Sequence, residues 1–114
     1  MRTTETTRRA EAAATSYLEM RGFNVVEQNF RRPHCAIDIV ATKDDVAFLI
    51  DVTYQRNDSQ TEALDFMTDS QLRQRRDAAA TWADENKWLR QCRWSVIEVV
   101  GKDFVIMHFI ENVM

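Results

Sequence analysis

The chain has 114 residues, of which 45% are hydrophobic and 29% charged, and its formal net charge at pH 7 is −3. This length and composition predict a single globular domain over residues 1–114, with a core that needs no cross-links. The net acidity argues against a uniformly basic surface that coats nucleic acid. No apolar run is long enough to span a membrane and the first residues are polar and charged, so we expect a cytoplasmic protein without membrane contacts.

The first predicted element is a helix over about residues 4–21, and Gly22 is placed to end it as a C-cap. Small and apolar residues recur at three- and four-residue spacing along one face of this helix. Glu11 borders that inward face. An acid in such a position is either a salt-bridge partner or a site residue, and ion pairing is the more common outcome.

A first strand is predicted over residues 23–30, followed by a turn over residues 31–34 because Pro33 cannot donate a hydrogen bond to a sheet. Two further strands, 36–42 and 46–54, flank a polar turn. Their two-residue period predicts two faces. Acidic and polar residues share one face and core residues share the other, the core residues being Ile37, Ile39, Ile50 and Val52 and the polar ones Asp51, Thr53 and Gln55.

The two strands around the polar turn carry one aspartate each, Asp38 and Asp51, at positions where aspartate is disfavoured. A symmetric hairpin about the middle of the turn places these two residues directly opposite each other. Like charges about 4 Å apart repel by roughly 4 kcal/mol at an effective dielectric constant near 20. The pair must therefore share a proton, pair with cations or bind a metal ion, and we predict a metal ion. Residues 33–65 carry seven acidic and two basic side chains, as a cation site requires, although solvated turns explain several of them.

The second half of the chain is predicted to hold a mobile polar connection over residues 57–65, a helix over residues 69–90 and strands over residues 94–100 and 104–109. Thr68 or Asp69 is the expected N-cap of the helix. The resulting order, α-β-β-β-α-β-β, predicts a mixed sheet flanked by two helices. Three arginines near the start of the second helix offer either phosphate contacts or a solvated face, and they are Arg73, Arg75 and Arg76.

Five segments of the chain together resemble the YraN-like proteins of the PD-(D/E)XK nuclease superfamily, which are related in fold to archaeal Holliday junction resolvases. The segments are similar to the family's Gly-Glu-x-x-Ala helix, its Gly-Tyr to Asn-x-Arg strand, its Glu-Ile-Asp-Leu-Ile-Ala and Phe-Val-Glu-Val strands and its closing His-Ile-x-Asn. In this chain they are Ala10–Ala14, Arg21–Arg31, Ile37–Ala41, Leu49–Val52 and His108–Asn112.

This resemblance implies an α/β, restriction-endonuclease-like mixed sheet of about five strands and a metal-dependent phosphodiesterase site. Glu11, Asp38 and Asp51 would hold Mg²⁺ or Mn²⁺ through carboxylate oxygens. Structured or branched DNA is the implied partner, and a homodimer would match the two-fold symmetry of a junction. The basic residues expected to contact nucleic acid are Arg31, Arg32, Arg56, Arg73, Arg75 and Arg76.

The chain departs from the family pattern where the acid-x-Lys motif ends, because the lysine position is Thr53. A neutral threonine cannot stabilise developing charge, and losing one such group typically costs about 10²–10³ in rate. Gln55, on the same face, or Arg56 at the end of the strand would be a partial substitute. Two functions therefore remain open, a weakened endonuclease and an inactive descendant that binds nucleic acid or protein. Other departures are Ala36 for glutamate, Gln71 for lysine and Arg93-Trp94-Ser95 for Arg-Phe-Asp.

Overall fold

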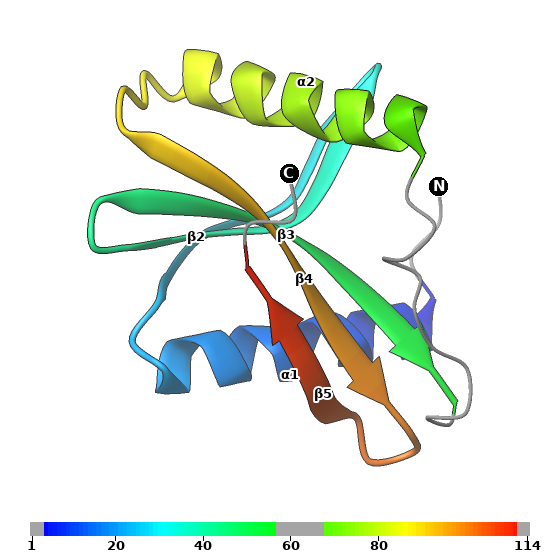
Figure 1. The fold of residues 1–114 in the computed structure, drawn as a ribbon. Helices are drawn as coiled ribbons and strands as arrows, with labels where there is room; N and C mark the ends of the chain where they lie inside the picture. The colour runs from blue at the N-terminus through cyan, green and yellow to red at the C-terminus, as the bar shows by residue number, and fades with distance from the viewer. Residues whose placement is uncertain (1–3, 57–67, 112–114) are drawn as a thin grey trace.

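The computed structural model describes residues 4–56 and 68–111. Their order is the predicted α-β-β-β-α-β-β, and one five-stranded sheet lies between two helices (Figure 1). The strands follow one another across the sheet in sequence order, and β3 and β4 are parallel while all other neighbours are antiparallel. The elements are α1 (Glu5–Met20), β1 (Asn24–Arg32), β2 (Cys35–Lys43), β3 (Val46–Gln55), α2 (Asp69–Glu85), β4 (Gln91–Val100) and β5 (Val105–Ile110). No described helix has the length and apolar character needed to cross a membrane.

Local signals define α1 as predicted. The Thr4 side chain accepts a hydrogen bond from the Thr7 N–H at 3.0 Å and caps the first turn. After the helix, Gly22 adopts a φ of +89°, a left-handed conformation that glycine tolerates without steric cost. The inward face buries three small or apolar residues, Ala10, Ala14 and Leu18, against the sheet.

The predicted register of the β2–β3 hairpin is confirmed. Ile39 pairs with Ile50 and Lys43 pairs with Val46, so the two-residue loop is Asp44-Asp45. Both loop residues have positive φ, 53° and 66°, as a type I′ turn requires. This turn matches the twist of the strands and therefore fixes which residues face each other from Lys43 and Val46 as far as Ile39 and Ile50.

The turn between β1 and β2 is shorter than predicted. Arg31 and Arg32 belong to β1, where they pair with Ala36 and Cys35, and only Pro33 and His34 form the turn. Because proline lacks a backbone N–H, it sits just beyond the last paired residue and leaves both arginines in the ladder. The prediction that these arginines lie in a turn was therefore wrong by two residues.

The alternation of side chains along β2 is interrupted at Asp38. The prediction that Ile37 and Ile39 point to the same face of the sheet was therefore wrong. Ile39 and Ile50 pack in the core under α1, as does the partly buried Val52, whereas Ile37 packs in the second core under α2. The recorded pairing of β2 with β3 ends at Ile39 and Ile50, and the rest of the β1–β2 hairpin bends toward α2 (Figure 1). This bend turns the strand between residues 37 and 39.

Helix α2 begins at the predicted place and ends five residues early. Its N-terminus is a capping box, in which Thr68 accepts from the Gln71 N–H and Gln71 accepts from the Thr68 N–H. Its end is closed by left-handed Lys87 (φ 54°) and by a hydrogen bond from the Trp88 N–H to the Ala83 carbonyl. The predicted continuation to residue 90 is therefore wrong, and the predicted connection over residues 57–65 lies outside the described residues.

Candidate acidic site

The Asp38 carboxylate lies where β2 and β3 separate. Its Oδ2 atom accepts a hydrogen bond from the Val52 backbone N–H at 2.9 Å. Burial raises the pKa of Asp38, the Val52 hydrogen bond opposes this rise, and the neighbouring charge of Asp51 adds to it. The predicted direct pairing of the two aspartates is not observed, because the recorded β2–β3 pairing ends at Ile39 and Ile50, although the charge of Asp51 still acts on Asp38. The charges of Arg31 and Arg75 compensate it in part.

Glu11 enters the site from α1 and is only 6% exposed. Burial raises the pKa of Glu11, and the nearby charge of Asp38 raises it further, while Arg31 and Asn29 oppose the rise. Within residues 4–56 and 68–111, Glu11 forms no salt bridge. Ion pairing, the more common role of an acid at such a position, is therefore not observed there. The acidic neighbour whose charge acts on Glu11 is Asp38.

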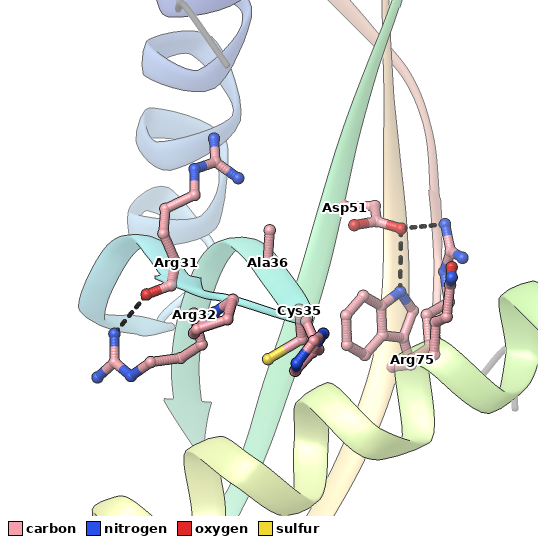
Figure 2. Close-up of a pocket in the computed structure, with 10 residues that line it drawn as sticks. Arg31, Arg32, Cys35, Ala36, Asp51 and Arg75 are labelled. Carbon is pink, nitrogen blue, oxygen red and sulfur yellow. Dashed lines mark hydrogen bonds and ion pairs between the residues drawn. The ribbon is translucent and has the colours of Figure 1, made fainter.

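Asp51 faces the opposite side of the sheet, toward α2. Its Oδ2 atom is 2.5 Å from Arg75 Nη2 and accepts a hydrogen bond from the Trp94 indole Nε1 at 3.2 Å (Figure 2). The Arg75 guanidinium also lies over the Trp94 ring, 5.5 Å from its centroid. Asp51 thus has a cationic partner from the protein itself, which is one of the three outcomes that the sequence allowed for the facing aspartates.

Glu11, Asp38 and Asp51 are the residues that would hold Mg²⁺ or Mn²⁺, because these ions prefer hard oxygen ligands such as carboxylates. The charge of Asp38 raises the pKa of Glu11, and the charge of Asp51 raises the pKa of Asp38. Even so, in the part of the chain that the structure describes, no three Asp, Glu, His or Cys side chains gather closely enough to hold a metal ion. The salt bridge to Arg75 keeps Asp51 directed toward α2.

A pocket of about 410 Å³ opens beside Asp51, between α2 and the turn of the β1–β2 hairpin (Figure 2). Three of the predicted nucleic-acid-binding arginines line it, Arg31, Arg32 and Arg75. The three arginines thus share one location, and their contact with nucleic acid stays a prediction. The remaining lining residues are Pro33, His34, Cys35, Ala36, Gln74 and Trp94.

The other predicted basic residues do not line this pocket. Arg73 and Arg76 are exposed on α2, and Arg56 is exposed just after β3. Arg32 forms a bidentate salt bridge with Glu85, the last residue of α2. Both side chains of this pair are about 40% exposed, so the pair adds little stability and the arginine remains available to another anion.

Thr53, at the lysine position of the family motif, faces a second pair of titratable residues. It lies directly opposite Glu98 on β4, and Glu98 lies opposite His108 on β5. The His108 Nδ1 atom is 2.6 Å from the Glu98 Oε1 atom. Sequence reasoning missed Glu98 and Trp94, because only the parallel pairing of β3 with β4 brings them beside the acid-x-Lys positions.

We predict that Asp38→Asn raises the melting temperature at pH 7 without divalent cations. Asparagine still accepts the Val52 N–H but carries no charge. Burial raises the pKa of Asp38 in the folded protein above its ordinary value of 3.8. Protonated Asp38 therefore contributes its full stability below pH 3.8, and this stability is lost as the pH rises through the pKa of the folded protein. Thermal melts across pH 3 to 8 should show the advantage of the variant growing with pH. Asp44→Asn, in the exposed turn, is the control, and a wild type that melts at or above the variant at pH 7 would contradict the prediction.

A mixed five-stranded sheet between two helices, in the order α-β-β-β-α-β-β, is consistent with the restriction-endonuclease-like fold of nuclease-like proteins of the PD-(D/E)XK class. A family model described as uncharacterised protein family UPF0102 matches residues 10–99. The chain belongs to this family, the YraN family of nuclease-like proteins.

Individual members of the family match most of the chain. A UPF0102 protein of Shewanella frigidimarina is 32% identical over 88 residues, which cover 77% of this chain and 82% of the relative. A UPF0102 protein of Shewanella loihica is 29% identical and covers 82% of each chain. A UPF0102 protein of Cytophaga hutchinsonii is 23% identical and covers 84% of this chain and 85% of its own length.

Proposed function

We propose that this protein binds the phosphodiester backbone of DNA, with structured or branched DNA favoured, at the pocket between α2 and the β1–β2 turn. One observation carries the proposal: Arg31, Arg32 and Arg75 line the same cavity as Asp51. Guanidinium groups bind phosphate oxygens through paired donors, and phosphate contacts supply most of the affinity for nucleic acid. The net charge of −3 confines such binding to a local basic site.

We further propose that Glu11, Asp38 and Asp51 hold a divalent cation, Mg²⁺ or Mn²⁺, beside the bound phosphate. A bound cation of this kind polarises the phosphate and lowers the pKa of an attacking water molecule. The positive charge of Arg31 acts on both Glu11 and Asp38 and lowers the pKa of each. Its side chain extends toward α1 (Figure 2). It would orient a phosphate over the acidic residues. Hydrolysis would be slow, because Thr53 supplies no positive charge.

A second candidate is a descendant of the nuclease fold that binds DNA or a protein without hydrolysis. The salt bridge of Asp51 with Arg75 favours it, because a guanidinium already neutralises one proposed metal ligand. Both candidates share the pocket and differ in whether a cation joins the phosphate there. A two-fold symmetric junction would accept two copies of the chain, and the mass of the complex would report how many bind.

The test is the affinity for a fluorescent four-way DNA junction, measured by anisotropy with and without Mg²⁺. We expect Mg²⁺ to strengthen binding, and we expect Asp51→Asn to remove this dependence because it deletes a cation ligand. Asp103→Asn, an exposed acid in the β4–β5 turn, is the matched control and should behave as wild type. Binding that is unaffected by Mg²⁺ in the wild type would favour the second candidate, and no binding of junction or duplex DNA would refute both DNA-binding proposals.

A further inference from the structure

A second pocket, of about 410 Å³, opens between the end of α1 and the β2–β3 turn. Its lining combines three phenylalanine rings with three basic and two acidic side chains. The pocket is separate from the one beside Asp51, because Lys43, which lines it, and Cys35, which lines the other, stand at opposite ends of β2. A cavity of this volume is in the usual range of small-molecule binding sites.

The basic side chains of this second pocket, Arg21, Lys43 and Arg93, have few partners. Lys43 Nζ donates to the Arg21 carbonyl at 2.8 Å, and no carboxylate of the described residues forms a salt bridge with Lys43 or Arg21. The Arg93 guanidinium lies 4.0 Å from Glu111, a long separation for an ion pair, and its side chain is 35% exposed. These cations therefore keep donors that an anion in the pocket would accept.

The apolar part of the pocket is a fixed cluster of rings. Phe23 packs edge-to-face on Phe48 and on Phe109, with centroid distances of 5.0 and 5.6 Å. Phe23 and Phe48 are only 7% and 5% exposed, so packing in the core under α1 holds them in place. Lys43 Nζ lies 4.9 Å from the Phe23 centroid, which puts a positive charge directly beside the rings. A ligand with an aromatic ring would extend this cluster, because aromatic pairs attract each other beyond the area that they bury.

The two acids narrow the choice of ligand. Asp44 is exposed in the β2–β3 turn, and the side chain of Glu111 is 48% exposed. Three basic and two acidic side chains leave the lining with a charge of +1, which favours an anion. Ionised carboxylates only accept hydrogen bonds, so a ligand that contacts them must also carry donors. Inorganic phosphate lacks the ring and an aromatic carboxylate lacks the donors, whereas a nucleoside monophosphate has the anion, the ring and the donors.

We propose that this pocket binds a nucleoside monophosphate, with the phosphate on Lys43 and Arg93 and the base against the phenylalanine rings. A sugar hydroxyl or base amino group donates to Asp44 or Glu111 at the rim. The same chemical group occurs in a free nucleotide and at the phosphorylated end of a nucleic-acid chain. This site goes beyond the proposed DNA-binding pocket and does not depend on it.

The test is isothermal titration calorimetry of the full chain with deoxyadenosine monophosphate. We expect wild type to bind it at least roughly tenfold more tightly than deoxyadenosine, which has no phosphate, or inorganic phosphate, which has no ring. Arg93→Gln and Lys43→Gln should each weaken binding roughly tenfold, the effect of losing one hydrogen bond to a charged group. Lys102→Gln removes an exposed lysine of the β4–β5 turn and should match wild type. Lys43 also holds the end of α1, so Arg93→Gln and the three ligands on wild type decide the question should Lys43→Gln impair folding.

Amide chemical shifts of the wild type locate the bound nucleotide. Deoxyadenosine monophosphate should move the signals of Lys43, Phe48 and Arg93. Shifts confined to the pocket of Asp51, equal affinities for the three ligands, or no binding of the nucleotide would each overturn the inference.

A 5′-phosphorylated oligonucleotide distinguishes the two sources of the ligand. Shifts at the same amides with this oligonucleotide would support the inference and identify a chain end as a ligand. Shifts there with the free nucleotide alone would also support it and show that the site selects the free form. Nucleotide binding by a protein that does not bind junction or duplex DNA would refute the proposed function and leave this site standing.

Discussion

Replacing Thr53 by lysine is expected to raise the rate of DNA cleavage about 10²–10³-fold, the effect typical of one well-placed charge-stabilising group. Position 53 follows Asp51 by two residues and therefore lies on the same face of β3. A lysine there restores a positive charge beside the proposed cation site, where negative charge develops on the phosphate. The measurement is the rate of cleavage of a labelled four-way junction in Mg²⁺ under single-turnover conditions.

The neighbour across the sheet determines how this experiment should be designed. Glu98 lies directly opposite Thr53, and its side chain is only 12% exposed. A lysine at position 53 would find this carboxylate within reach and pair with it. We therefore expect Thr53→Lys combined with Glu98→Gln to cleave faster than Thr53→Lys alone.

Thr53→Met is the matched control, because methionine lengthens the side chain without adding charge. It should leave the cleavage rate at the wild-type level. If Thr53→Lys and its combination with Glu98→Gln both cleave no faster than Thr53→Met, the missing lysine is not what limits this site. The non-hydrolytic binding module then becomes the better description of the protein.

Trp94→Ala is expected to lower the free energy of unfolding by about 3–5 kcal/mol, the usual range when a large aromatic side chain is removed from a core. Trp94 is 1% exposed and packs in the cluster under α2, together with Phe30, Leu49 and Trp82. Its removal leaves a cavity between α2 and the sheet and also deletes a hydrogen-bond donor to Asp51. Urea denaturation followed by circular dichroism measures the loss.

Trp94→Phe separates these two contributions. Phenylalanine fills most of the space but has no N–H, so we expect a smaller loss of stability, about 0.5–1.5 kcal/mol from the missing hydrogen bond together with a minor packing loss. The altered partner set of Asp51 should also change the Mn²⁺ affinity, which Trp88→Phe should not, because Trp88 donates to the Gln91 carbonyl instead. A Trp94→Ala protein as stable as wild type would contradict the packing described here.

Short-range signals explain most of what the sequence predicted correctly. The polar loop Asp44-Asp45 sets a two-residue turn, and that turn fixes the β2–β3 register over the residues that pair. Thr4 and Thr68 cap the two helices through contacts three residues away. The wrong predictions also concern short-range features, namely the end of α2 and the bounds of the β1–β2 turn. Both depend on the backbone conformation of single residues such as Lys87.

The sequence by itself determined the order of elements and the register of the paired part of the β2–β3 hairpin, because each depends on local periodicity or on turn chemistry. Only the tertiary structure decided the partners of Asp51. Arg75 is 24 residues away and Trp94 is 43 residues away, and both reach Asp51 because β4 lies parallel to β3 under α2. No local pattern specifies which strand becomes the neighbour of β3, since that choice depends on burying both faces of the sheet at once. The difference between a carboxylate open to a metal ion and one neutralised by arginine therefore arises from packing.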